Sequence, residues 1–307
     1  MNPEHPAAAP DAVDPAAVKR AFGRAAGTYE AAAVLQREVG ARMAERLDLV
    51  KLSPEAILDA GCGTGEALGA LAARYPAARR TALDLAWPMV AAARERHCPR
   101  RSALARVVAA WRRSTTAPPL FVTGDIAALP FAAGTFGLVW SNLALQWIGD
   151  LPRALSEMHR VLRVEGLAMF TTLGPDTLRE LRAAFRDADS GPHVNRFADM
   201  HDVGDMLVQA GFADPVMHME RITLTYADPL AVVRDLKAIG ATNATVARRR
   251  GLLGRGRWSR MLTALDGMRR DGRIPATFEV VYGHAWKVAP TRTPEGHAIV
   301  RVERLQR

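Results

Sequence analysis

The sequence predicts an α/β fold in which a mostly parallel β-sheet carries helices on both faces. Short apolar runs alternate with stretches of helical periodicity from about residue 56 to residue 173, as in consecutive βαβ units. The first apolar run also leads through a glycine-dense turn straight into a helical pattern, in "ILDAGCGTGEALGALAARY" at 57–75. Strands that alternate with helices over this length predict a largely parallel sheet.

The elements of this core follow from the spacing of apolar residues. The segment 15–49 has helical periodicity, and 100–119 reads as an extra helical insertion that ends in Pro118-Pro119. Strands are expected at 56–60, 81–85, 120–125, 136–142 and 166–173, and helices at 66–75, 88–97 and 151–162.

The alternation changes after residue 173. We expect helices at 174–189, capped near Asp176, and at 200–211, then a strand at 216–226, a basic and mostly helical segment at 228–273, and a last strand from 278. Helices inserted before the last strand would lie over the C-terminal edge of the sheet, where open α/β sheets bind ligands. The predicted regions are a disordered N-terminus at 1–13, a helical cap at 14–52, the sheet core at 53–173, a covering region at 174–275 with a returning strand near 212–226, the final strand at 276–290 and a tail at 291–307.

Composition limits the class of protein. The 307 residues are 49% hydrophobic and 24% charged, as in ordinary globular proteins. Cys62 and Cys98 are too few for a disulfide framework or a four-cysteine zinc site, so we expect no metal and a reducing compartment. There is no signal-peptide pattern and no apolar run of about 18 residues. We therefore expect a cytoplasmic protein that does not span a membrane.

Positive charge is concentrated in one segment. The chain has a net charge of +9, and residues 234–273 contain eleven basic and three acidic residues. Such a segment can attract an acidic partner, although solvated helix faces explain it equally well.

The glycine turn indicates a nucleotide site of one of two classes. Gly61, Gly63 and Gly65 give the spacing G-x-G-x-G, whereas dinucleotide-binding proteins have G-x-G-x-x-G, and Glu66 occupies the position where those proteins need a small residue. With Asp59 before it, "DAGCGTG" resembles the first motif of class I S-adenosylmethionine-dependent methyltransferases. That resemblance implies a Rossmann-like fold with seven strands, and cofactor contacts by Asp59, Cys62 and the three glycines.

Acidic residues end the next two predicted strands at the same edge of the sheet. Asp84, followed by Leu85, can accept hydrogen bonds from a ribose diol in either class, or can cap the next helix. Asp125 and Ile126, in "GDIAALPF", resemble the methyltransferase segment that binds adenine. The following strand ends in "SNL", which adds Asn142 and Leu143 to the expected site. Together these residues predict S-adenosylmethionine as the cofactor.

Longer blocks resemble one family, the malonyl-[acyl-carrier-protein] O-methyltransferases of biotin biosynthesis. The resemblance runs from about Val18 to Lys287 and includes "AFGRAAGTYEAAAVLQREVG", "SNLALQWIGDLPRALSEMHRVLRVEG" and "PATFEVVYGHAWK". It implies methylation of the free carboxylate of malonyl-acyl carrier protein, which masks the malonyl group so that a pimeloyl chain can be built. A carboxylate is already ionised at neutral pH, so no catalytic acid or base is expected. The insertion at 100–119 departs from shorter members, and its role stays open.

Further site residues are implied by the same resemblance. Tyr29 and Gln36 would lie in a helical segment that closes over the cofactor, and Gln146 and Trp147 near the transferred methyl group. Substrate contacts are hypothesised for Arg179, Arg182, His193 and Asn195, with an arginine fork on the malonyl carboxylate. Acyl carrier protein is acidic, so the expected docking surface comprises Arg248, Arg249, Arg250, Arg255 and Arg257. We expect a monomer; the sequence does not choose between carrier protein and coenzyme A thioesters.

Of four other functions, two stay open and two are disfavoured. A methyltransferase acting on a quinone precursor would share "GDIAALPFAAGTFGLVWSN", and an assembly factor of respiratory complexes that modifies a protein arginine would share the C-terminal block. A nucleic-acid-binding protein is disfavoured, because the basic segment has Trp258 as its only aromatic residue for base stacking. A dehydrogenase is disfavoured by the glycine spacing and Glu66.

Overall fold

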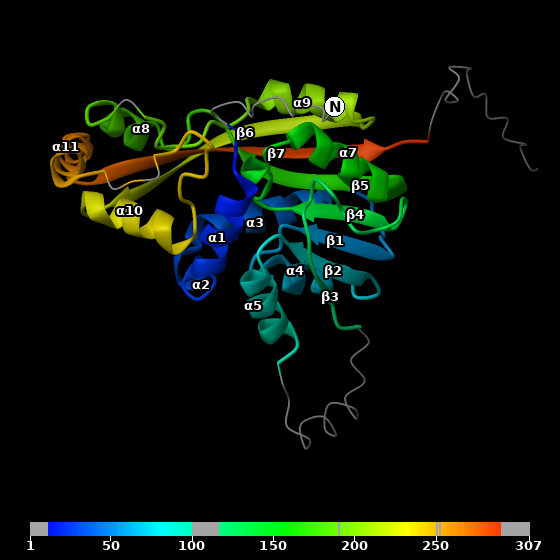
Figure 1. The fold of residues 1–307 in the computed structure, drawn as a ribbon. Helices are drawn as coiled ribbons and strands as arrows, with labels where there is room; N and C mark the ends of the chain where they lie inside the picture. Colours follow the sequence, from blue (N-terminus) through cyan, green and yellow to red (C-terminus); the bar gives the residue numbers. More distant parts are fainter. Residues whose placement is uncertain (1–11, 100–116, 190, 250, 252, 290–307) are drawn as a thin grey trace, which may run out of the picture.

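A single seven-stranded sheet organises the protein (Figure 1). The computed structural model describes residues 12–99, 117–189, 191–249, 251 and 253–289. The strand order is β3-β2-β1-β4-β5-β7-β6, in which β1 to β5 are parallel, β7 is antiparallel to β5 and β6 is antiparallel to β7. The predicted α/β fold with a mostly parallel sheet is confirmed. The strands are β1 (Ala56–Ala60), β2 (Arg79–Asp84), β3 (Leu120–Thr123), β4 (Phe136–Ser141), β5 (Leu162–Leu173), β6 (Ala213–Tyr226) and β7 (Ile274–Lys287).

Helices cover both faces of this sheet because the central strands are apolar on both sides. In β1 and β4, Ile57 and Leu138 face one apolar core that includes α3 and α4, while Leu58 and Val139 face another that includes α7 and α9. Continuous burial of this kind is typical of parallel strands. The helices are α1 (Pro15–Ala25), α2 (Tyr29–Ala32), α3 (Val34–Arg46), α4 (Ala67–Arg74), α5 (Trp87–His97), α7 (Leu151–Val161), α8 (Arg179–Arg186), α9 (Met200–Gln209), α10 (Pro229–Ala238) and α11 (Arg255–Asp266), with 3₁₀ turns η1 (Leu47–Leu49) and η2 (Leu145–Trp147).

The N-terminal cap is broken where the sequence predicts continuous helical periodicity. It begins firmly, because the Asp14 carboxylate accepts hydrogen bonds from the backbone of Ala16 and Ala17 and Pro15 occupies the first turn. The helix then stops after Ala25, and Ala33 leaves the helical conformation between α2 and α3. These breaks turn the chain so that α1 and α2 reach over the edge of the sheet.

Three other sequence expectations need correction. The helix expected at 174–189 with a cap near Asp176 begins only at Arg179, because Leu178 has a left-handed backbone with φ of 54°. Among its described residues the basic segment is helical only in α10 and α11, and the chain at 239–249 between them folds as turns and loop. Of the expected disordered segment 1–13, Ala12 and Val13 are ordered by hydrogen bonding to the loop at Thr245 and Val246, and 1–11 lie outside the described residues.

The long β6–β7 pair extends beyond the parallel strands at the left of Figure 1, where α8, α10 and α11 gather around it. This places the covering helices beside the end of the sheet at which β1, β2 and β4 finish. The expected insertion at 100–119 and the tail at 291–307 lie mostly or wholly outside the described residues. Within the described part of the chain, no helix combines the length and apolar character needed to cross a lipid bilayer.

Candidate active site

A cavity of about 770 Å³ lies at the C-terminal ends of β1 to β4, beneath α1 and α2. Its volume suits a nucleoside-sized ligand. Nine residues expected at the cofactor site or beside it line this cavity: Tyr29, Gly61, Gly63, Asp84, Leu85, Asp125, Ile126, Asn142 and Leu143. Trp147, expected near the methyl group, lines it as well.

The glycine turn shapes the floor of this cavity. Gly61 has φ of 82°, and a Cβ atom there would overlap the side chain of Ala144. The amides of Gly61 and Cys62 donate to the carbonyl of Leu83 at 2.8 and 2.9 Å, which ties the turn to the end of β2. Only glycine meets both requirements of position 61, a left-handed backbone and close approach to a neighbour.

Gly65 has another role from the one expected. Its φ is 78°, and an added Cβ would come within 3.1 Å of Ala93 and of the His97 ring. His97 Nε2 also lies 2.7 Å from the Gly65 carbonyl oxygen. Gly65 therefore allows α5 to pack closely, and it is not among the residues lining the large cavity.

Asp84 holds the turn in place from β2. Its Oδ2 accepts a hydrogen bond from the Gly63 amide at 2.9 Å, and its Oδ1 accepts one from the Ala86 amide at 2.8 Å. Burial raises the pKa of this carboxyl, and the two amide hydrogen bonds oppose that shift. The carboxylate thus fixes both the glycine turn and the start of α5, and it still faces the cavity. This geometry fits the predicted contact with a ribose diol.

Two polar groups without partners mark a smaller adjoining cavity of about 40 Å³. Asp59 Oδ2 and Gln36 Oε1 are both buried and have no hydrogen-bond partner, and both residues line this cavity with Gly61, Cys62 and Gly63. Buried acceptors without donors are rare in proteins. A ligand that carries donors and positive charge, such as the ammonium group of a methionine, would satisfy them.

Burial raises the pKa of Asp59 to about 7, with the Asp84 charge contributing further. The folded protein therefore holds a proton on Asp59 that the unfolded chain releases from about pH 4 upward, so stability should fall as pH rises from about 4 through 7. We expect Asp59→Asn to flatten that dependence and to be more stable than the wild type at pH 8. Urea unfolding across this range checks it; a slope equal to that of the wild type would contradict the assignment.

The end of β4 joins the turn to the N-terminal cap. Asn142 Nδ2 donates to the Gln36 carbonyl at 2.9 Å, and its Oδ1 accepts from Thr171 Oγ1 at 2.7 Å. Leu143 follows with φ of 49°, a strained backbone for a leucine, and its amide donates to Thr171. Strain of this kind, held by buried hydrogen bonds, positions Leu143 in the wall between cavities.

Contacts from α2 hold the cap over the site. Arg96 on α5 pairs with Glu30 at 2.9 Å and with Glu66 at 2.7 Å, and the Thr64 hydroxyl donates to Glu30. Glu66, whose position in the sequence disfavours a dinucleotide site, therefore links α2 to the sheet through Arg96. The edge-to-face pair of Phe22 and Trp147, with ring centroids 5.2 Å apart, closes the other side.

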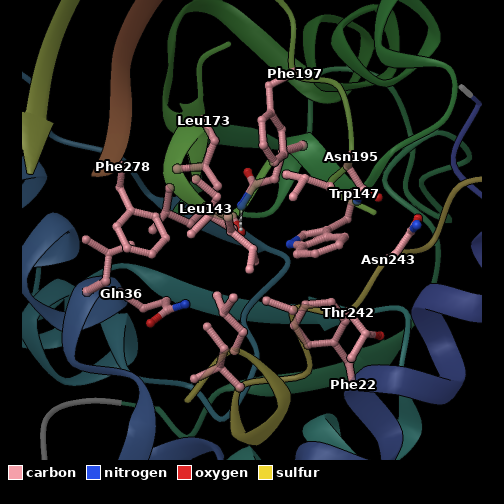
Figure 2. A pocket seen from close by; sticks show the side chains of 18 of the residues that line it. Phe22, Gln36, Leu143, Trp147, Leu173, Asn195, Phe197, Thr242, Asn243 and Phe278 are labelled. Carbon is pink, nitrogen blue, oxygen red and sulfur yellow. Dashed lines mark hydrogen bonds between the residues drawn. The ribbon is translucent and has the colours of Figure 1, made fainter. Parts of the chain in front are cut away.

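A third, mostly apolar cavity of about 80 Å³ adjoins the large one (Figure 2). Phe22, Tyr29, Leu143 and Trp147 line both, so the two spaces share a wall. Figure 2 shows the rings of Phe197, Phe278 and Trp147 around it. Of the expected residues, Gln36, Gln146, His193 and Asn195 also line it. Gln146 Nε2 donates to the Leu143 carbonyl at 2.7 Å, which braces the strained residue.

The two arginines expected on the substrate carboxylate lie elsewhere. Arg179 pairs with Asp176 and Glu180, and Arg182 donates to the carbonyls of Pro175 and Thr177. Neither is among the residues lining the apolar cavity. The polar groups there are neutral: side-chain amides, the hydroxyls of Tyr29 and Thr242, and His193. The His193 ring stacks on Phe185 with centroids 3.9 Å apart, and its buried Nε2 has no hydrogen-bond partner and lies 3.7 Å from Asp189 Oδ2.

The expected docking arginines separate into two groups. Arg248 is largely covered, donating to Asp14 at 2.9 Å and to the Thr245 carbonyl, so it braces the start of α1. Arg255 is exposed, and Arg249 and Arg257 each lie 3.7 Å from Asp189 at the surface. Arg250 lies outside the described residues.

Sequence reasoning missed several lining residues. Phe22 lies seven residues before Tyr29, hence on the same helical face, but that spacing equally predicts ordinary core. Phe197, Thr242 and Phe278 come from three distant segments that only the folded chain brings together. No signal in the sequence marks them.

Comparisons with known proteins agree with this geometry. Residues 58–170 match the family model described as "Methyltransferase domain". The chain is 53% identical to the malonyl-[acyl-carrier protein] O-methyltransferase of Gallionella capsiferriformans over 94% of this chain and 96% of the relative, and 55% identical to that of Laribacter hongkongensis over 90% of each. Among solved structures, the YcgJ protein of Bacillus subtilis is similar with a TM-score of 0.53 at 15% identity, over 81% of this chain and 98% of that one, which supports the fold.

Proposed function

This chain belongs to the malonyl-[acyl-carrier protein] O-methyltransferase family, and from that membership we propose that it methylates the free carboxylate of malonyl-acyl carrier protein. The methyl donor is S-adenosylmethionine, and the methyl ester primes pimeloyl synthesis for biotin. The observation that supports the proposal most is the shared wall of Phe22, Tyr29, Leu143 and Trp147 between a nucleoside-sized cavity and an apolar cavity.

The residues at the sheet edge fit S-adenosylmethionine. Asp84 would hold the ribose, Asp125 and Ile126 the adenine, and the unpartnered acceptors Asp59 and Gln36 the methionine ammonium. The cofactor supplies an electrophilic methyl group on a sulfonium. The glycine turn lets the backbone of Gly61 and Gly63 approach it closely.

Residues of this chain then need only to align the acceptor and exclude water. A carboxylate attacks in its ionised form, so no side chain has to remove a proton. Burial raises the pKa of the Tyr29 hydroxyl, which keeps it protonated and able to donate a hydrogen bond in the shared wall. Orientation and exclusion of water can supply several kcal/mol of the barrier reduction.

We further infer that neutral donors, rather than an arginine fork, bind the malonyl carboxylate. His193 and Asn195 line the apolar cavity, whereas Arg179 and Arg182 are committed to Asp176, Glu180 and backbone carbonyls. An ion pair strong enough to hold the carboxylate would also weaken it as a nucleophile. Arg182 is expected to position the loop at Asn195 through its own hydrogen bonds.

Exposed arginines near α11 are the proposed contact for the acidic body of the carrier protein. Arg255 and Arg257 lie on α11, with Arg249 nearby. Arg248 is not part of this proposed surface, because it forms an ion pair with Asp14. Charge complementarity of this kind acts mainly on association.

Labelled S-adenosylmethionine tests the proposed function. The purified protein should transfer label to malonyl-acyl carrier protein, and base treatment should release it, as expected for a methyl ester. Malonyl-coenzyme A and RNA serve as comparison acceptors. Label only on RNA, on a protein arginine or on a quinone precursor would overturn the proposal.

Replacing Trp147 by alanine should reduce kcat on malonyl-acyl carrier protein by about tenfold or more, because the change opens the shared wall to water and removes the partner of Phe22. Trp87→Ala is the matched control, since that indole is 56% exposed on α5 and lines neither cavity. Equal kcat in the two variants would exclude Trp147 from the site.

A further inference from the structure

A separate groove of about 380 Å³ lies between the N-terminal cap and α10. Small residues form its floor, among them Ala21, Ala25, Ala238 and Gly240. Three cationic side chains line it: Arg24 from α1, and Arg234 and Lys237 from α10. The groove is therefore narrow, concave and positively charged.

These three cations are available to a ligand. All three residues are exposed, and among the described residues none of them forms a hydrogen bond or an ion pair. The nearest acid along α10, Asp235, instead accepts a hydrogen bond from the Tyr226 hydroxyl at 2.9 Å. By contrast, Arg42, Arg96 and Arg269 elsewhere on the surface each pair with a carboxylate. The part of the chain that the structure describes therefore does not neutralise the positive charge of the groove.

The groove lies beside the apolar cavity of the active site. Thr242 lines both spaces, and Gly240, with φ of 76°, brings the loop against Phe22 and Ala25, where an added Cβ would lie 3.2 Å from each. The Thr28 hydroxyl donates to the Ala238 carbonyl at 2.8 Å and joins the cap to α10. A substrate arm that extended from the apolar cavity past Thr242 would therefore reach this cationic groove.

We propose that Arg24, Arg234 and Lys237 bind the phosphate group of the pantetheine arm that carries the malonyl thioester. This inference rests on the proposed function, since it names the part of that substrate which the groove takes. The thioester lies at one end of the arm and a phosphodiester at the other, and arginine and lysine donate charge-assisted hydrogen bonds to phosphate oxygens. The small floor residues leave room for a thin arm and its phosphate. The protein body of the carrier would then lie outside, towards α11, which packs on α10 (Figure 1).

Three acceptors distinguish the contribution of the phosphate to catalysis from that of the carrier polypeptide. They are malonyl-pantetheine, malonyl-phosphopantetheine and malonyl-acyl carrier protein. The wild type should show kcat/KM about tenfold higher with malonyl-phosphopantetheine than with malonyl-pantetheine, equivalent to about 1.4 kcal/mol. Arg234→Glu with Lys237→Glu should abolish that ratio, and so should Arg24→Glu. The phosphate-free acceptor reports in the same assay that each variant is folded.

Two comparison variants complete the design. Arg79→Glu reverses an exposed charge at the start of β2, at the opposite edge of the sheet, and should keep the wild-type ratio. Arg255→Glu with Arg257→Glu should lower kcat/KM with the carrier protein and keep the phosphate ratio. If the groove variants keep the wild-type ratio of kcat/KM between malonyl-phosphopantetheine and malonyl-pantetheine, the inference is wrong. It is also wrong if these variants lose kcat/KM only with malonyl-acyl carrier protein, because the groove would then contact the carrier polypeptide. If the wild type methylates none of the three acceptors, the proposed function itself fails, and the inference with it.

Discussion

Replacing Asp84 by alanine is expected to raise the Kd for S-adenosylmethionine by at least about 100-fold, because hydrogen bonds to a charged acceptor contribute roughly 1.5–3 kcal/mol each and two ribose hydroxyls are involved. The change also frees the Gly63 amide, which donates to Asp84 at 2.9 Å, so the glycine turn loses its link to β2. Asparagine should not rescue binding, since both carboxylate oxygens accept from backbone amides and an Asn Nδ2 would face one of them. Calorimetric titration of each variant measures the effect.

A matched variant distinguishes cofactor contact from general destabilisation. Asp199→Ala removes a carboxylate that caps α9 by accepting from the His201 amide, and Asp199 lines none of the three cavities of the site. It should cost about 1 kcal/mol of stability and leave cofactor affinity unchanged. An Asp84→Ala protein that binds S-adenosylmethionine within threefold of the wild type would contradict the assigned role.

Replacing Gly61 by alanine should lower the free energy of unfolding by roughly 2–5 kcal/mol and abolish measurable cofactor binding. One part of this loss is the left-handed backbone at φ of 82°, and the other is the overlap of the new Cβ with Ala144. Urea unfolding measures the free energy of unfolding, and titration with S-adenosylmethionine measures cofactor binding.

Gly134→Ala is the control for the stability that Gly61→Ala loses through its left-handed backbone alone. It has φ of 70°, but nothing lies within 4 Å of an added Cβ, so Gly134→Ala should lose only about 1–2 kcal/mol. Adding Ala144→Gly to Gly61→Ala removes the overlap and should bring the loss down to the Gly134→Ala level. If Gly61→Ala and Gly134→Ala lose equal stability, close packing at Gly61 is not what the turn requires.

The residues proposed to hold the cofactor could be brought together from the sequence because they follow one repeated local pattern. Asp84 ends β2 and Asp125 follows β3, and parallel strands end at the same edge of a sheet, so sequence order alone brings both residues to the turn at Gly61. Gly65 shows the limit of this reasoning. It belongs to the same motif, yet its absent side chain makes room for α5.

The acceptor half was less predictable because it is assembled from distant segments. Arg182 was expected to contact the substrate, but the left-handed backbone of Leu178 makes α8 begin only at Arg179. The Arg182 guanidinium donates instead to the carbonyls of Pro175 and Thr177 in the preceding loop. Arg248 reads as one of a basic cluster until Asp14, more than two hundred residues earlier, is found beside it. Such pairings depend on tertiary packing, which hydrophobic periodicity does not encode.

Intact-mass measurement of the carrier protein tests the central claim most directly. After incubation with this protein and S-adenosylmethionine, malonyl-acyl carrier protein should gain the mass of one methyl group, and fragmentation should place it on the malonyl carboxylate. Acetyl-acyl carrier protein has no free carboxylate and should gain none. Methylation of the acetyl form, or a methyl group on the carrier polypeptide instead of the malonyl group, would contradict the account.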